Sequence, residues 1–178
     1  AVRRTDAVND IVVMIETDTG NIGYGSAAAT PAITGETENS IITAIQQHIT
    51  PCLMGQSLIS FNDVLHLTQT ALEGNTSAKA AVDIALYDLF AQRCQMPLYQ
   101  FLGGNNNTLS TSVTISVKAI NEMVADALLF VSQGLTTLKI KLGLNSVEDL
   151  KRMKAIRAAV GEKITLLVDA NQGWKVND

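Results

Sequence analysis

Three pairs of polar residues in the second half of the sequence have the types and spacing that acid–base and metal chemistry require. In each pair the two residues stand two positions apart near the end of a strand-like run: Thr114 and Ser116, Lys139 and Lys141, and Asp169 and Asn171. Side chains two positions apart on a strand point to the same side of it. The sequence therefore predicts three strands that each present a polar pair on one face.

The two lysines are the most informative pair, because lysine is rarely buried without a partner. An ammonium group beside another cation loses proton affinity, which makes lysine a usable general base. Asp169 follows the apolar run 165–168 and could supply one ligand to Mg²⁺, since carboxylate and amide oxygens suit that ion. The residues alone leave a second interpretation open, in which Lys139 and Asp169 form an interior ion pair with no chemical role.

From about residue 109 the sequence alternates between predicted strands and helices. Strands are predicted over 109–117, 136–143 and 163–174, with helices over 121–134 and 146–161 between them. This order, with short connections, implies parallel strands and right-handed crossovers. In α/β barrels such strands carry their active-site residues at the carboxyl ends. We expect the apolar side chains of Ile140 and Val168 to face the barrel interior.

The first hundred residues predict a different, α+β arrangement. A hairpin is predicted over 10–25, followed by a loop over 26–36, a helix over 40–53 that Pro51 ends, and a helix over 60–73. Ser77 is expected to cap a long alanine-rich helix with one buried stripe, formed by Ala78, Ala81, Val82, Ala85, Leu86 and Leu89. The Gly- and Asn-rich segment 103–107 predicts a linker, which gives a first domain over 1–105 and a second over 106–178.

Composition and charge exclude several classes of partner. The net charge is −4 and the 13 lysines and arginines are scattered, so we expect no nucleic-acid partner. No apolar run is long enough to span a bilayer, so we expect no membrane partner. Cys52 and Cys94 lack metal-site spacing and are interpreted as reduced core residues, which favours the cytoplasm. His48 and His66 are interpreted as structural helix residues rather than ligands.

Several strings resemble a known family. Lys139-Ile140-Lys141 followed by Asp169-Ala170-Asn171 is similar to the KxK and DxN motifs of the muconate-lactonizing branch of the enolase superfamily. The longer strings TTLKIKLG, VDANQGW, SAKAAVDIALYDLFAQ and MPLYQFLGG resemble the dipeptide epimerases, in particular the L-Ala-D/L-Glu type. The resemblance covers nearly the whole chain. It implies an α+β capping domain followed by the first βα units of a (β/α)₈ barrel.

The resemblance also implies a role for each site residue. Lys141 would be the base that removes or returns the α-proton on one face of the substrate, with Lys139 beside it. Asp169 would be the first of three carboxylate ligands to Mg²⁺, with Mn²⁺ as a possible substitute. Thr114 would contact the substrate, and Arg3 would bind its side-chain carboxylate. Asn171 belongs to the DxN motif without a firm role, and the loop over 33–37 resembles the mobile capping loop of the family.

The reaction implied is a 1,1-proton transfer, the epimerisation of a dipeptide at the carbon α to a carboxylate by a homo-oligomeric isomerase. The alternatives are a muconate cycloisomerase or o-succinylbenzoate synthase, and a binding domain or fragment without turnover. Arg3 and Thr114 favour the dipeptide epimerase. The other two carboxylate ligands and the opposite-face lysine belong to strands that would follow residue 178, and a first strand of the capping domain would precede residue 1. We therefore expect these 178 residues alone to be inactive.

Overall fold

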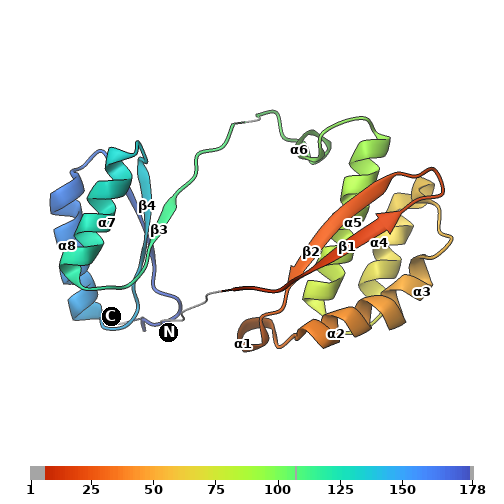
Figure 1. The fold of residues 1–178 in the computed structure, drawn as a ribbon, viewed down its shortest axis with the longest axis horizontal. Helices are drawn as coiled ribbons and strands as arrows, with labels where there is room; N and C mark the ends of the chain where they lie inside the picture. The colour runs from red at the N-terminus through yellow and green to blue at the C-terminus, as the bar shows by residue number, and fades with distance from the viewer. Residues whose placement is uncertain (1–6, 107, 177–178) are drawn as a thin grey trace. The chain divides into compact units, whose positions relative to one another are not determined.

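The structure is a computed structural model that describes residues 7–106 and 108–176, and these two stretches form two compact units (Figure 1). Each unit has its own sheet and its own hydrophobic core. The sequence predicted a boundary between 105 and 106, and the units divide at 107 and 108.

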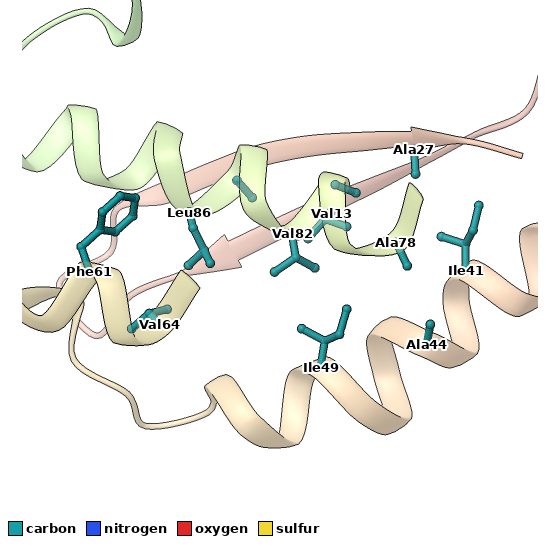
Figure 2. Close-up of a cluster of buried hydrophobic side chains, with 12 residues drawn as sticks. Val13, Ala27, Ile41, Ala44, Ile49, Phe61, Val64, Ala78, Val82 and Leu86 are labelled. Carbon is teal, nitrogen blue, oxygen red and sulfur yellow. The ribbon is translucent and has the colours of Figure 1, made fainter. Parts of the chain in front are cut away.

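The first unit is built on an antiparallel hairpin and a long helix. Strands β1 (Asp10–Glu16) and β2 (Ile22–Ala28) pair in register from Asp10↔Ala28 to Glu16↔Ile22. Helix α5 (Thr76–Arg93) lies along one face of this hairpin (Figure 2). The predicted alanine-rich stripe of α5 is buried, as expected.

Helical segments between residues 38 and 70 cover the other side of α5 (Figure 2). The larger elements are α2 (Glu38–Thr43), the π-helical η1 (Ala44–Ile49) and α4 (Phe61–Thr70). Short helical segments complete the unit: α1 (Pro31–Thr34), α3 (Thr50–Leu53), η2 (Leu58–Ser60) and α6 (Leu98–Phe101). The core is therefore a three-layer arrangement of hairpin, α5 and helices.

Three local predictions in the first unit were wrong. Pro51 does not end its helix, which continues to Leu53. The wider π-helical turn just before Pro51 gives the proline ring room beside the carbonyl of Gln47. Strand β2 extends to Ala28 through a stretch predicted as loop, because its small side chains pack against α5. The cap of α5 is Asn75 rather than Ser77.

The second unit is a parallel βαβαβ arrangement, as predicted. Its strands lie in the order β3 (Val113–Ile115), β4 (Thr137–Lys141) and β5 (Thr165–Asp169). Helices α7 (Ile120–Ser132) and α8 (Ser146–Val160) connect them and cover one face of the sheet (Figure 1). Strand β3 is shorter than predicted and excludes Ser116. The predicted fold class, an α+β unit followed by the first βα units of a barrel, is confirmed.

The free cysteines and the histidines lie nearer the surface than the core. Cys94 is exposed and Cys52 is only half-buried, so the prediction of two core cysteines was wrong. Both residues stand near the ends of helices, where fewer neighbours cover a side chain. His48 and His66 are exposed on their helices. Among the residues that the structure describes, no helix is both long enough and apolar enough to cross a bilayer.

Candidate active site

Strand β4 separates the two faces of the second sheet. Leu138 and Ile140 are fully buried beneath the helices, whereas Lys139 and Lys141 alternate with them and point to the opposite face. The expectation that Ile140 faces the barrel interior was therefore wrong, since side chains of neighbouring residues on a strand cannot share a face. Val168 lies on the same helix-side face as Ile140 and is 45% exposed at the edge strand.

The strand register brings the polar residues of three strands together on the face that the helices leave open. Lys139 pairs with Thr114 on β3, and Lys141 pairs with Asp169 on β5. Thr114 is exposed on the same face as Lys139. Ser116 lies just beyond β3 and is also exposed. The parallel pairing thus sets Thr114 beside Lys139 and Asp169 beside Lys141 on one face of the sheet.

Both lysines contact the same carboxylate oxygen. The Nζ atoms of Lys139 and Lys141 lie 2.9 Å and 2.7 Å from Oδ2 of Asp169. The three side chains retain exposed fractions of 37%, 29% and 27% in this chain. The ion pair that formed the simpler interpretation is present, but it is open to solvent and holds two cations on one anion.

Asn171 completes this cluster. Its side-chain Oδ1 accepts a hydrogen bond from Nζ of Lys141 at 3.0 Å, and its backbone N–H donates to Oδ1 of Asp169 at 3.0 Å. Asn171 has a φ of 48°, in the left-handed region that asparagine tolerates better than most residues. The left-handed turn after β5 therefore places an amide oxygen beside the ammonium group of Lys141 that the Asp169 carboxylate already contacts.

The cluster keeps Asp169 ionised. Hydrogen bonds from Lys141 and then from Lys139 lower the pKa of the Asp169 carboxyl far below its ordinary value, and the backbone N–H of Asn171 adds to the effect. The carboxylate is consequently negative throughout the physiological pH range, which is the state that a metal ligand requires.

Comparison with known families identifies both parts of the chain. Residues 2–103 match the mandelate racemase / muconate lactonizing enzyme N-terminal domain, and residues 122–178 match the enolase C-terminal domain-like family. The chain belongs to the mandelate racemase / muconate lactonizing enzyme family. The resemblance to the dipeptide epimerases of this superfamily is confirmed as well.

The relatives of this family member include several epimerases. An L-Ala-D/L-Glu epimerase from Clostridium acetobutylicum is 50% identical over 98% of this chain and 49% of its own length. A substrate-liganded L-Ala-D/L-Glu epimerase from Bacillus subtilis superposes with a TM-score of 0.89 at 46% identity, over 94% of this chain and 47% of that one. A dipeptide epimerase from Cytophaga hutchinsonii, complexed with Mg and D-Ala-L-Val, has a TM-score of 0.85 at 37% identity, over 95% of this chain and 46% of that one. The chain therefore spans about half the length of the relatives it matches.

The donor set at the sheet edge suits part of a magnesium site. Asp169 offers an ionised carboxylate and Asn171 an amide oxygen, and both are hard oxygen donors of the kind that Mg²⁺ prefers. Within residues 7–106 and 108–176, no group of three His, Cys, Asp or Glu side chains is placed to hold a metal ion. Among these residues, Asp169 is the carboxylate that the cluster could offer to such a site.

Two residues differ from the others in how the sequence and the structure treat them: Arg3 was predicted as a site residue, and Asp149 was not. Arg3 lies outside the described residues. The buried carboxylate of Asp149 on α8 was not predicted from the sequence, and its contacts join the loops that follow β4 and β5. Its signal in the sequence was an aspartate in the first turns of a helix that begins five residues after the KxK motif.

Proposed function

We propose that the protein containing this chain is a Mg²⁺-dependent epimerase that transfers a proton at the carbon α to a carboxylate of a dipeptide, such as L-Ala-D/L-Glu. The observation that carries the proposal is the cluster in which Lys139 and Lys141 share one oxygen of Asp169 on the open face of a parallel sheet. A proton-transfer site needs a base beside a group that can stabilise negative charge on the substrate, and this cluster offers both. The dipeptide epimerases at up to 50% identity support the same reaction class.

Lys141 is the base in this proposal. Its ammonium nitrogen lies at the carboxyl end of β4 and is held by Asp169 and Asn171 rather than by the helix side of the sheet. In the neutral form it would accept the α-proton from one face of the substrate, and in the charged form it would return it. Lys139 places a second positive charge on the same oxygen of Asp169. A substrate carboxylate arriving at this face would therefore meet a positively charged edge.

Asp169 would hold the metal ion, and the side-chain oxygen of Asn171 lies in the same cluster as a second oxygen donor. When bound, Mg²⁺, or Mn²⁺ in its place, supplies positive charge against the negative charge that builds on the substrate carboxylate as the α-proton leaves. Because Asp169 is already ionised, metal binding at neutral pH need not displace a proton from it. Lys139 and Lys141, which both contact Oδ2 of Asp169, would then lie beside the metal ion and the substrate.

Thr114 and Arg3 are proposed as substrate contacts. Thr114 lies beside Lys139 in the register and is exposed on the open face, where a substrate would lie. Arg3 is assigned from the family resemblance alone, as the partner of the substrate's side-chain carboxylate. We further propose a homo-oligomer in the cytoplasm, which light scattering and cell fractionation would test.

The direct test is an assay of the full-length protein against a panel of dipeptides. With Mg²⁺, chiral chromatography should show conversion of L-Ala-L-Glu to L-Ala-D-Glu, and a chelator should stop it. Absence of epimerisation on the whole panel, with cyclisation of a muconate instead, would replace this function by the cycloisomerase alternative.

Substitution of Arg3 sharpens the substrate assignment. Arg3→Met should raise KM for Glu- or Asp-containing dipeptides far more than for neutral ones, because loss of one partner of a desolvated charge pair costs about 2–5 kcal/mol. KM measured on acidic and neutral dipeptides of similar size gives the comparison. Equal losses on both kinds of dipeptide would remove Arg3 from the substrate site.

A further inference from the structure

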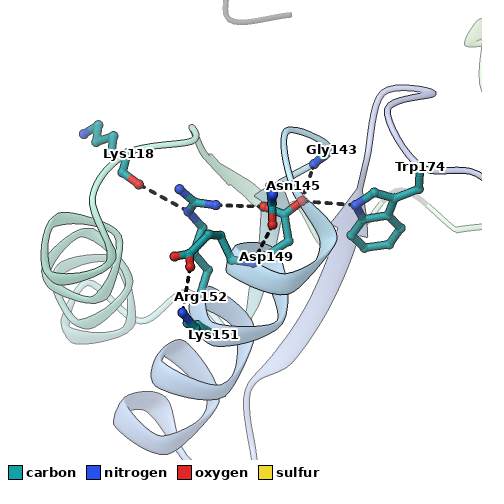
Figure 3. Close-up of polar contacts among 8 residues, drawn as sticks. Lys118, Gly143, Asn145, Asp149, Lys151, Arg152 and Trp174 are labelled. Carbon is teal, nitrogen blue, oxygen red and sulfur yellow. Dashed lines mark hydrogen bonds and ion pairs between the residues drawn. The ribbon is translucent and has the colours of Figure 1, made fainter. Parts of the chain in front are cut away.

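A buried carboxylate on α8 connects the loops that follow β4 and β5 of the second unit. The side chain of Asp149 is fully buried, and its Oδ2 accepts hydrogen bonds from the backbone N–H of Gly143 at 2.8 Å and from Nε1 of Trp174 at 3.1 Å (Figure 3). Its Oδ1 pairs with Nη1 of Arg152 at 2.9 Å. Gly143 lies in the loop after β4 and Trp174 in the segment after β5, so one side chain joins both.

Arg152 extends this connection to the loop after β3. Its Nε donates to the backbone carbonyl of Lys118 at 3.4 Å, and its side chain is only 15% exposed (Figure 3). Burial by itself would raise the pKa of Asp149, but the hydrogen bonds from Gly143, Trp174 and Arg152 outweigh it and lower the pKa. The network is therefore a satisfied, ionised pair rather than an orphaned buried charge.

The segment after β5 needs such an anchor, because its backbone is strained. Asn171 and Gln172 both have positive φ values, 48° and 62°, which residues other than glycine adopt rarely. Gly173 and Gly143 then bring the two loops so close that a Cβ on Gly173 would collide with the carbonyl of Gly143. A strained turn persists only where its surroundings hold it in place. Here the hydrogen bond from the indole N–H of Trp174 to Asp149 holds the last residue of the turn.

The strained turn is the same turn that aims Asn171 at the base. The side-chain oxygen of Asn171 accepts from Lys141, and its backbone N–H donates to Asp169. Release of Trp174 would let the turn relax out of the left-handed region, and both bonds would then lose their geometry. The contacts thus lead from Asp149 through Trp174 and the turn to Asn171, and so to the nitrogen that is proposed to move the proton.

We propose that Asp149 is a positioning residue for the proton transfer: its buried carboxylate clamps the turn 170–174 against the loop after β4 and thereby holds Asn171 and Asp169 on Lys141. The proposal rests on the proposed function only through the role of Lys141. The placement of the turn itself is a property of the folded protein and is measurable without substrate.

The kinetic test compares Asp149→Asn and Trp174→Phe with the control Glu148→Gln in the full-length protein. Glu148 is the neighbour of Asp149 on α8, but its side chain is exposed and pairs with Lys151. Both test variants should lower kcat about tenfold to a hundredfold, because a misplacement of about 1 Å at a reacting group costs that much, while KM changes little. The double variant should be no slower than the slower single variant, since both act through one turn.

An NMR measurement separates this positioning role from a purely structural one. In Asp149→Asn the indole N–H resonance of Trp174, assigned by its loss in Trp174→Phe, should move upfield as its charged acceptor disappears. The side-chain amide resonances of Asn171 should move in both test variants and stay in place in Glu148→Gln.

Unmoved Asn171 resonances, or moved resonances with an unchanged kcat, would overturn the proposal. Loss of stability alone, with normal kcat below the unfolding temperature, would overturn it too. A wild-type protein without epimerase activity would refute the proposed function, and the Asn171 resonances would still decide whether Asp149 places the turn.

Discussion

Side chains alternate between the two faces in both sheets of the molecule, but the two sheets carry different kinds of residue on those faces. In the β1–β2 hairpin the face toward α5 carries Gly23, Gly25 and Ala27, and the helix backbone lies almost against it. In the β3–β5 sheet the helix face carries large apolar residues such as Leu138 and Ile140, and the open face carries the charged cluster. A sheet packed through glycine and alanine is a rigid support, whereas a sheet with one uncovered polar face is available for chemistry.

The contrast depends on a few atoms in the first sheet. A Cβ on Gly25 would collide with the backbone carbonyl of Ala81, and a Cβ on Gly23 with that of Ala85. These close approaches explain why the helix is rich in alanine and why β2 contains small residues. They also predict that the two sheets respond to substitution in opposite ways: stability suffers in the first and turnover in the second.

The largest effect is expected from Asp169→Asn in the full-length protein. Within residues 7–106 and 108–176, Asp169 is the only carboxylate that forms ion pairs with Lys139 and Lys141, and it is also the proposed ligand of the metal ion. Loss of a residue that only hydrogen-bonds to a metal ligand costs about 10–100-fold in metal affinity or activity. We therefore expect Asp169→Asn to lower both the Mg²⁺ affinity and the epimerase activity by at least about that factor. Calorimetric titration with Mg²⁺ and the epimerase assay measure it. Asp126→Asn, which breaks the surface pair with Lys118, is the control, and equal behaviour of the two variants would refute the site.

A stability effect without a catalytic one is expected from Gly25→Ala. The added methyl group must push α5 away from the hairpin, and such overpacking costs about 1–3 kcal/mol in free energy of unfolding. Ser26→Ala on the exposed face of the same strand is the matched control and should change this free energy by about 0.5 kcal/mol or less. Urea unfolding of the three proteins provides the measurement. A Gly25→Ala protein as stable as the wild type would mean that α5 does not pack on the strand so closely.

A smaller loss of stability is expected from substitution of Glu36, which anchors the loop over 33–37 to the first turn of α5. Its carboxylate is 7% exposed and accepts the N–H and the hydroxyl of Ser77, the latter at 2.6 Å, together with the N–H of Ala78. Glu36→Gln should cost about 1–3 kcal/mol, whereas Glu73→Gln on the surface should cost little.

The same residue gives a pH dependence with a definite sign. Burial by itself would raise the pKa of Glu36, but the hydrogen bonds from Ser77, Ala78 and Thr76 lower it below its ordinary value of 4.5. A lowered folded-state pKa stabilises the protein fully above that ordinary value, and the contribution disappears as the pH falls below it. The stability difference between wild type and Glu36→Gln should therefore shrink from pH 6 toward pH 3. A difference that stays constant over this range would contradict the role of the charge.

The sequence predicted the clustering of Lys139, Lys141 and Asp169 better than it predicted the first unit's local structure. The KxK spacing predicts a shared face directly, because a strand repeats every two residues, and parallel pairing then sets Lys141 beside Asp169. Asn171 reaches the same cluster from a left-handed turn beyond β5, which the strand repeat does not predict. The helix that runs through Pro51 could not be predicted, because the π-helical turn before it depends on the packing around it. The extent of β2 and the burial of Asp149 were likewise decided by contacts with distant segments, which a one-dimensional pattern does not contain.

Lys141 is proposed to exchange the α-proton on one face of the substrate, and deuterium exchange measures this proton transfer at the α-carbon itself. The full-length protein is incubated in deuterated water with Mg²⁺ and, separately, with L-Ala-L-Glu and L-Ala-D-Glu, and α-deuterium incorporation is followed by mass spectrometry. Lys141→Ala should lose exchange of one diastereomer by about 10²–10⁴-fold, while Lys154→Ala, an exposed lysine of α8, should behave as wild type. Unchanged exchange of both diastereomers in Lys141→Ala would remove Lys141 from the mechanism and contradict the account.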